Sequence, residues 1–137
     1  MPPASVDVGL DHITVTVDDL TSAARFFDAV LAPLGLGRLV DYEDPEDEEE
    51  AGVEAIGYGI EAVELWIVVG RAPTTGLHLA FAAPDRGAVD SSYAAGLAVG
   101  ATSEHLPRSW QIYRPGRYSA MLRDPAGNIV EAFTDQT

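Results

Sequence analysis

Two histidines and two glutamates recur along this chain in the order His, Glu, His, Glu, at His12, Glu64, His78 and Glu131. Imidazole nitrogen and carboxylate oxygen together suit Zn, Ni, Co, Mn or Fe(II). Two histidines and one carboxylate with open positions form the pattern of non-haem Fe(II) oxygenases, and a second glutamate gives a set of four ligands with room for substrate oxygens. These residues indicate divalent-metal chemistry, provided that the fold brings them to one place.

The order of these residues belongs to an internal repeat. When His12 is placed over His78, further positions match without a gap. The matching pairs are Ile13 and Leu79, Val15 and Phe81, Asp19 and Asp85, Phe27 and Tyr93, and Leu31 and Leu97. A second block, residues 63–66, matches residues 130–133 at an offset one residue longer. Each half therefore begins with a histidine in an apolar strand and ends with a glutamate in an apolar strand.

Both halves show the same succession of strand and helix signals. The polar and apolar alternation over 12–17 predicts a half-buried strand. Asp19 and Asp85 are expected to cap helices that end at the glycines 35, 37 and 100. Further strands are expected near 38–43, 53–59, 62–69, 101–106, 117–123 and 128–134. The stretch 107–116, which contains Pro107 and Pro115, is expected to be a loop, and 124–128 a turn. Each half thus has the order β-α-β-β-β.

Because side chains alternate along a strand, the two faces of the predicted sheet can be assigned. Val15 and Val17 are expected to pack on the helix, which leaves His12 on the other face. The same alternation puts the second histidine and both glutamates on that face. Trp66 and Phe133 share it, and they either contact a substrate or fill the core. A few polar groups among apolar walls is the composition of a lined cavity.

Two carboxylates on a partly apolar face are unfavourable without a counter-charge. The chain has no lysine, and no arginine falls on these strand positions. A divalent cation would supply the charge. A single histidine at a strand start is more often structural, and a single strand glutamate is more often exposed, but the recurrence of all four on one face favours metal ligation. His105 has no repeat partner and is expected at the surface.

Composition narrows the function classes. The net charge is −14, and all eight basic residues are arginine, so nucleic-acid binding is not expected. No apolar run approaches the length of a membrane span, the first residues do not resemble a signal peptide, and cysteine is absent, so a cytoplasmic location is expected. The acidic run 43–50 is expected to be a solvated loop. An acidic surface also suits a cationic ligand.

Four segments resemble the vicinal-oxygen-chelate superfamily of glyoxalases, bleomycin resistance proteins and dioxygenases. They are residues 11–15, residues 18–20 followed by Phe26 and Phe27, residues 77–81 and, most specifically, the sequence Asp-Pro-Ala-Gly-Asn-Ile-Val-Glu over 124–131. The resemblance covers nearly the whole chain, from Leu10 to Phe133. It implies an α+β fold of two tandem βαβββ modules, which form a cup-shaped mixed sheet with helices on the outer face. We therefore expect one glyoxalase-like domain over 1–137, with repeats at about 9–70 and 75–135.

The resemblance also implies a site. The matching positions make His12, His78 and Glu131 metal ligands, and Glu64 matches the fourth ligand of glyoxalase I-like members. Many members of this size are homodimers whose sites combine modules of both subunits. The segment 107–118 resembles an aromatic loop of glyoxalase-like members, which would cover the cup or pack at a dimer interface, and its Tyr118 is expected to bind substrate. The sequence shows no cluster of basic residues positioned to bind the carboxylates of glutathione.

Three functions remain open. The first is a metal-dependent lyase or isomerase acting on a small molecule that binds one divalent metal per site through adjacent oxygens, with Glu131 or Glu64 moving the proton. The second is an Fe(II) extradiol-type dioxygenase, for which His12, His78 and Glu131 suffice. The third is non-enzymatic binding of a cationic antibiotic, which suits the net charge but leaves the intact ligand set without a role.

Overall fold

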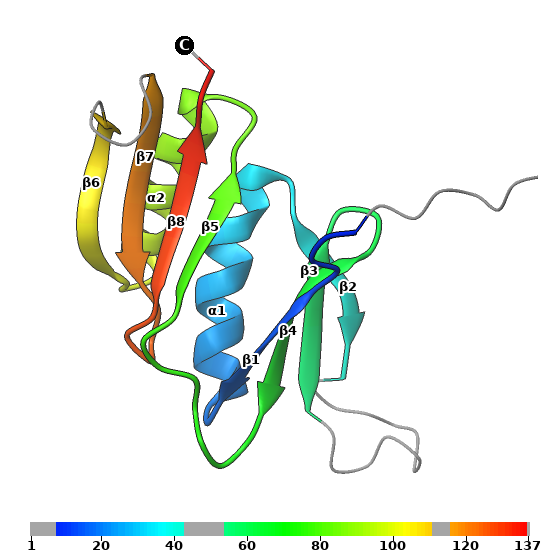
Figure 1. The fold of residues 1–137 in the computed structure, drawn as a ribbon. Coiled ribbons are helices and arrows are strands. Elements are labelled where there is room, and N and C mark those ends of the chain that lie inside the picture. The colour runs from blue at the N-terminus through cyan, green and yellow to red at the C-terminus, as the bar shows by residue number, and fades with distance from the viewer. Residues whose placement is uncertain (1–7, 43–53, 111–115, 137) are drawn as a thin grey trace, which may run out of the picture.

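The computed structural model describes residues 8–42, 54–110 and 116–136. The elements are β1 (Ile13–Val17), α1 (Leu20–Leu31), a short 3-10 helix η1 (Ala32–Leu34), β2 (Gly37–Asp41), β3 (Ala55–Gly59), β4 (Val63–Val69), β5 (His78–Ala82), α2 (Arg86–Ala98), β6 (Thr102–Trp110), β7 (Arg117–Arg123) and β8 (Ile129–Thr134). Both halves follow the predicted β-α-β-β-β order (Figure 1). The acidic run 43–50 lies outside the described residues.

The described strands form two four-stranded mixed sheets, ordered β1-β4-β3-β2 and β5-β8-β7-β6. In each sheet the first and last strands of the unit pair in parallel, and the remaining pairs are antiparallel. The sheets stand side by side, with β1 and β5 at their adjoining edges (Figure 1). The fold is the expected α+β arrangement of two similar modules, built from two separate sheets rather than one continuous sheet.

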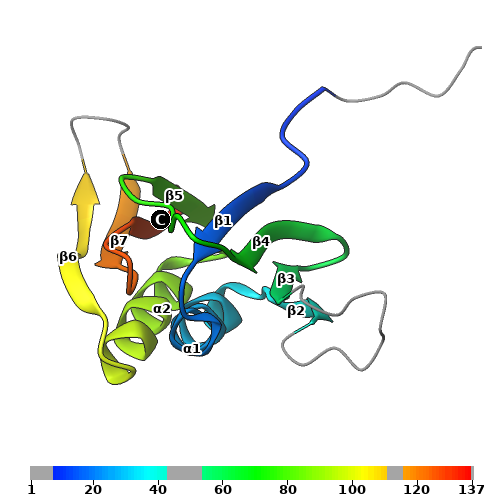
Figure 2. The same cartoon turned by 90° about the horizontal axis from the view of Figure 1, so that it is seen from below.

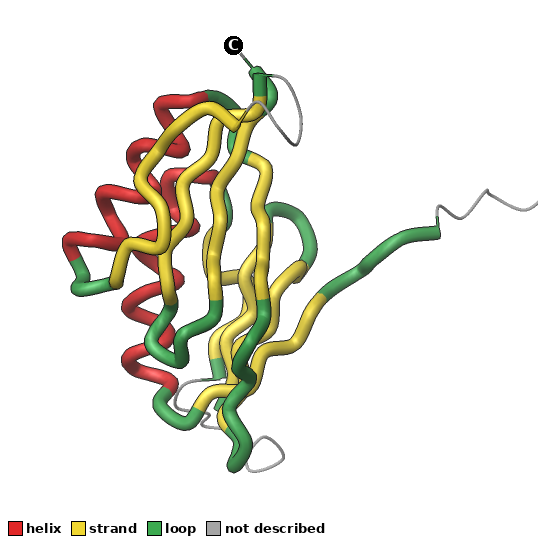
Figure 3. The backbone as a smooth tube through the Cα atoms, turned by 60° about the vertical axis from the view of Figure 1, so that its left-hand side comes forward, coloured by secondary structure: helices red, strands yellow, loops and turns green. Residues whose placement is uncertain are grey.

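Both helices lie on the same side of the two sheets (Figures 2 and 3). α1 and α2 pack against each other, and the Ser92 hydroxyl of α2 donates to the Val30 carbonyl of α1 at 2.7 Å. Gly96 permits this close packing, because a Cβ there would lie 2.3 Å from Leu122 Cδ1 and 3.1 Å from Val30 Cγ2. The opposite faces of the sheets are left free for a site.

The predicted helix boundaries are confirmed. Asp19 accepts from the backbone N–H of Ser22 and Asp85 from that of Ala88, so each carboxylate caps its helix. Gly35 and Gly100, with φ of 92° and 91°, adopt the left-handed conformation after the helices. Within the described ranges, no helix is both long enough and apolar enough to cross a membrane.

The alternation predicted for the strands is also confirmed. Val15, Val17, Leu65 and Ile67 are buried on the helix side. The expected loop over 107–116 is wrong for its first part, because β6 continues to Trp110. Pro107 lies within β6 and lacks a backbone N–H. Because β6 is the edge strand of its sheet, the loss of one hydrogen-bond donor there is tolerated.

Candidate metal centre

The second sheet brings one histidine and one glutamate into contact. His78 Nε2 lies 2.7 Å from Glu131 Oε1. The Glu131 side chain is 10% exposed, whereas that of His78 is 47% exposed. A buried carboxylate beside an imidazole nitrogen on an open sheet face supplies two donors of the kinds that divalent transition metals bind.

The register of two parallel strands creates this contact. His78 lies opposite Ile129 and Ala80 opposite Glu131, so the histidine and the glutamate meet across a diagonal of the β5–β8 pair. Both side chains point away from α2, because the alternate residues Leu79 and Val130 are buried on the helix side. The contact therefore follows from alternation together with a parallel register.

The turn before β8 holds this register in place. The buried Asp124 carboxylate accepts from the backbone N–H groups of Ala126 and Asn128. The Asn128 side chain accepts from the Leu77 N–H at 3.0 Å and donates to the Thr74 carbonyl at 2.8 Å. The most specific block of the sequence thus ties β8 to the segment that leads into His78, which gives most of the block a structural role.

A cavity of about 340 Å³ opens at this pair. Its lining residues are His78, Ala80, Trp110, Arg117, Ser119, Met121 and Glu131. They come from all four strands of the second sheet. The cavity combines apolar walls with several hydrogen-bond donors, as small-molecule sites do.

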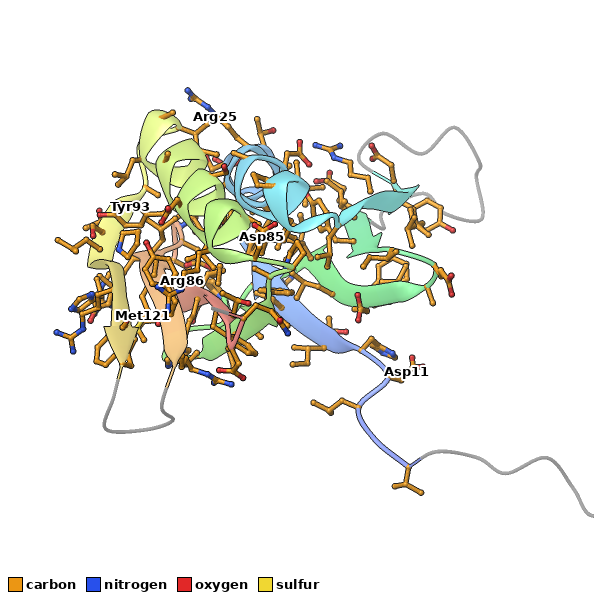
Figure 4. The ribbon with its side chains drawn as sticks, turned by 90° about the horizontal axis from the view of Figure 1, so that it is seen from above. Asp11, Arg25, Asp85, Arg86, Tyr93 and Met121 are labelled. Atoms are coloured by element: carbon orange, nitrogen blue, oxygen red, sulfur yellow. The ribbon has the colours of Figure 1, made fainter. Side chains whose placement is uncertain are left out.

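The first sheet holds the other two predicted ligands. Ile13 lies opposite Leu65 in the parallel β1–β4 pair, so His12 and Glu64 fall at one level on the same face. His12 Nδ1 is 2.7 Å from Asp11 Oδ2, and Glu64 is exposed beside the β3–β4 turn. Figure 4 shows Asp11 on the arm that leads into β1, well away from Met121 in the cavity. Within the described part of the chain, no three His, Asp or Glu residues form a group that could hold a metal.

The predicted substrate contacts are divided among different places. Trp66 is half-buried on the face of His12 and Glu64. Phe133 shares the face of Glu131 and is covered by Arg117, whose guanidinium carbon is 3.9 Å from the ring centroid. Tyr118 lies on the helix face of β7, where its hydroxyl donates to Asp90 of α2. That hydrogen bond, together with partial burial, raises the pKa of the Tyr118 hydroxyl. The structure does not bring Tyr118 into the cavity.

Ser119, next to Tyr118, lines the cavity and is not among the residues predicted for the site. The apolar residues Ala120 and Leu122 mark the helix face of β7, so alternation assigns Ser119 and Met121 to the opposite face. The signal was therefore present in the sequence. Trp110 and Arg117 belong to the segment 107–118 that resembles an aromatic loop, and the structure makes them walls of this cavity.

Comparison with known proteins gives the family. No family model matches the chain, and no curated protein matches it. Among solved structures, a glyoxalase/bleomycin resistance protein from Albidiferax ferrireducens T118 is 30% identical, covers 90% of this chain and 95% of its own, and superimposes with a TM-score of 0.70. That identity extends over nearly the whole length of both chains.

Two more distant structures share the fold. The lactoylglutathione lyase of Agrobacterium tumefaciens is 24% identical, with 98% of this chain and 96% of that chain covered and a TM-score of 0.59. The fosfomycin resistance protein FosX of Listeria monocytogenes, in complex with Mn(II) and sulfate, is 19% identical, with 94% and 93% covered and a TM-score of 0.62. The chain belongs to the glyoxalase/bleomycin resistance protein family of the vicinal-oxygen-chelate superfamily.

Proposed function

We propose that this protein is a metal-dependent lyase or isomerase of the glyoxalase type, acting on a small molecule with adjacent oxygens. The observation that carries the proposal is the 2.7 Å contact between His78 Nε2 and Glu131 Oε1 at the cavity. A buried carboxylate that faces an imidazole nitrogen, with no lysine in the chain, fits a divalent cation. The candidates are Zn, Ni, Co, Mn and Fe(II), one ion per site.

The site is completed by a second copy of the chain. His78 and Glu131 form one half-site, and His12 and Glu64 form the other half-site on the first sheet. The two half-sites lie apart within one copy, and β1 and β5 are both sheet edges. A twofold homodimer would join the first sheet of each copy to the second sheet of its partner and form two equal sites. In this proposal each chain is one glyoxalase-like unit, and two chains work together as a dimer.

Each residue then has a defined task. His12, Glu64, His78 and Glu131 would hold a divalent metal, which would supply Lewis acidity to stabilise negative charge on substrate oxygens. The carboxylate of Glu131, or of Glu64, accepts a proton from substrate carbon and returns it. Trp66 of the second copy faces the same space and excludes water from it, while Phe133 supports the wall behind Arg117.

Metal analysis of mixed variants tests this proposal. Protein purified without chelator or affinity metal should hold about one divalent ion per chain, and His12→Ala and His78→Ala should each lose it. Unfolding and refolding the two variants together should restore about a quarter of the metal, because each mixed dimer has one intact site. His105→Ala, at the third histidine, should retain full metal content.

Two results would contradict the proposal. Retention of metal in His12→Ala would show that His12 is not a ligand of the proposed shared site. No recovery in the mixture, with both single variants empty, would exclude a site shared between copies. Iron in the wild-type protein, with oxygen uptake on a catechol, would favour dioxygenase chemistry over isomerisation.

A further inference from the structure

Two polar atoms in the cavity have no hydrogen-bond partner. The hydroxyl of Ser119, which is 0% exposed, and the indole Nε1 of Trp110 are both buried and unpartnered among the described residues. Both residues line the cavity that contains His78 and Glu131. Buried donors are almost always bonded, and an unbonded one is unfavourable for stability. Two such atoms in one cavity indicate that a ligand bonds them.

Two bulges in β6 put these donors together. The pairing of β6 with β7 shifts by one residue between Ser103 and His105, and again between His105 and Arg108. As a result Arg108 lies opposite Ser119 and Trp110 opposite Arg117. Continuing the register of the Ser103–Leu122 pair would instead bring the exposed Leu106 opposite Ser119. Bulges often re-aim side chains beside active sites.

Two arginines lie at this end of the cavity, although the protein as a whole is acidic. The chain carries −14, yet Arg108 and Arg117 both lie on the cavity face of the β6–β7 pair. The Arg108 guanidinium stacks on Trp110, with its carbon 3.7 Å from the ring centroid. The Arg117 Nε and Nη2 donate to Asp135 at 3.0 and 3.1 Å. Arg108 therefore contributes more positive potential here than Arg117, whose charge is paired.

Every unsatisfied group here can donate, and the indole N–H can do nothing else. A ligand atom that satisfies them must be an acceptor, and the nearby guanidinium favours a charged acceptor. We propose that this end of the cavity binds an oxoanion group of the ligand, a carboxylate or a phosphonate or phosphate, through Trp110 Nε1, the Ser119 hydroxyl and the charge of Arg108. The inference rests on the proposed function in one respect, since the remainder of the ligand would reach the His78–Glu131 half-site.

The indole N–H of Trp110 reports directly on this proposal. The chain has two tryptophans, so a ¹H–¹⁵N spectrum of the full-length, chelator-treated protein shows two indole signals, from Trp66 and Trp110. Sodium acetate and sodium methylphosphonate are titrated at constant ionic strength against sodium chloride. The Trp110 signal should shift saturably and by more than the Trp66 signal, because the indole N–H of Trp110 has no partner and would donate directly to the anion. The tighter of the two probes identifies the ligand as a carboxylate or as a phosphorus oxoanion.

Variants separate a binding role from a structural one. Ser119→Ala should weaken binding of the tighter probe about ten-fold or more, and should leave the melting temperature equal or higher, because the hydroxyl has no internal partner to lose. Trp110→Phe should weaken it similarly while keeping a ring for Arg108. Ser109→Ala is the matched control, since Ser109 lies opposite Tyr118 on the other face of β6 and is exposed.

The outcomes distinguish this inference from the metal proposal. Oxoanion binding is measured on chelator-treated protein and should persist there without metal, because the donors lie on β6 and β7. No saturable Trp110 shift with either anion, or unchanged binding in Ser119→Ala, would overturn the inference even if the metal site is real. A saturable shift with methylammonium in place of the anions would also overturn it, and would favour a cationic ligand.

Discussion

Helix α1 buries seven residues, whereas α2, at the equivalent place in the repeat, buries three. Phe27 is 0% exposed, while its repeat partner Tyr93 is half-buried and bonds Ser103 through its hydroxyl. Leu31 is likewise fully buried, and its partner Leu97 is 41% exposed. The first half therefore supplies much of the hydrophobic stabilisation, while the second half carries the cavity and the His–Glu contact. The two halves of a repeat can therefore differ, with more of the buried core in one half and the cavity in the other.

The carboxylates of the two halves differ in the same way. The sequence repeat aligns Glu64 with Glu131. The strand pairing instead makes Trp66 equivalent to Glu131, because Trp66 lies opposite Thr14 and Glu131 lies opposite Ala80, the repeat partner of Thr14. Glu64 consequently lies level with His12, whereas Glu131 lies two residues beyond the level of its histidine. The first sheet thus presents its pair near the strand ends, and the second sheet presents its pair inside a cavity.

The largest effect that sharpens this comparison is on stability. Phe27→Ala should lower the free energy of unfolding by about 3–5 kcal/mol, because it leaves a cavity in a fully enclosed part of the core. Tyr93→Ala should cost about 2 kcal/mol or less, since its ring is partly exposed. Urea denaturation measures both. Equal losses in the two variants would break the proposed division between the halves.

A smaller effect is expected at the turns that precede the last strand of each half. Asn128→Ala should cost about 2–3 kcal/mol, because it leaves the Leu77 N–H and the Thr74 carbonyl without partners. Glu61→Ala, at an exposed position of the corresponding β3–β4 turn, should stay within about 0.5 kcal/mol of wild type. Thermal melts of the two variants check this. If Asn128→Ala lowers the free energy of unfolding by less than about 1 kcal/mol, Asn128 does not hold β8 to the segment before His78.

The smallest effect concerns an ionic cluster of the first half, and it depends on pH. Burial alone would raise the pKa of Asp28, but hydrogen bonds from Arg38 and Tyr58 outweigh it, so that pKa lies below the ordinary value of 3.8. A lowered folded-state pKa stabilises the protein above the unfolded-state value, and this stabilisation is lost as the pH falls through the folded-state value.

At pH 7, Asp28→Asn should therefore cost about 1–2 kcal/mol, a modest figure because the carboxylate is 44% exposed. The difference from wild type should shrink as the pH falls below about 4. In the second half, Glu104→Gln, which removes the exposed contact with Arg123, should cost about 0.5 kcal/mol or less. Urea denaturation at pH 7 and pH 3 tests the pair, and a constant Asp28→Asn deficit across that range would contradict the assignment.

Much of the fold could be predicted because it depends on local signals. Alternation predicts Val15 and Val17 on the helix face, and an aspartate before each helix marks where the helix begins. The same reasoning put His78 and Glu131 on one face, where they are in contact. Side-chain alternation and helix capping each depend on only a few neighbouring residues, so both can be recognised from a single sequence.

The parts that could not be predicted depend on pairing between distant strands. The two bulges of β6, which bring Trp110 over the cavity, have no signature in the sequence of that strand alone. The level of Glu64 relative to His12 also depends on register, and alignment of the repeats assigns it differently from the structure. Whether the two sheets join into one depends on which strands pair at their edges. That pairing is set by the whole folded chain and is not encoded in any single segment.

The irregular β6 also bears on how this protein behaves at high concentration. An edge strand offers unpaired N–H and C=O groups to any other extended chain, and long, flat edges promote aggregation. β6 is nine residues long, but its two register shifts and Pro107 interrupt the row of groups that another strand would need. The distortion that brings Trp110 to the cavity thus also discourages uncontrolled growth of the sheet at that edge.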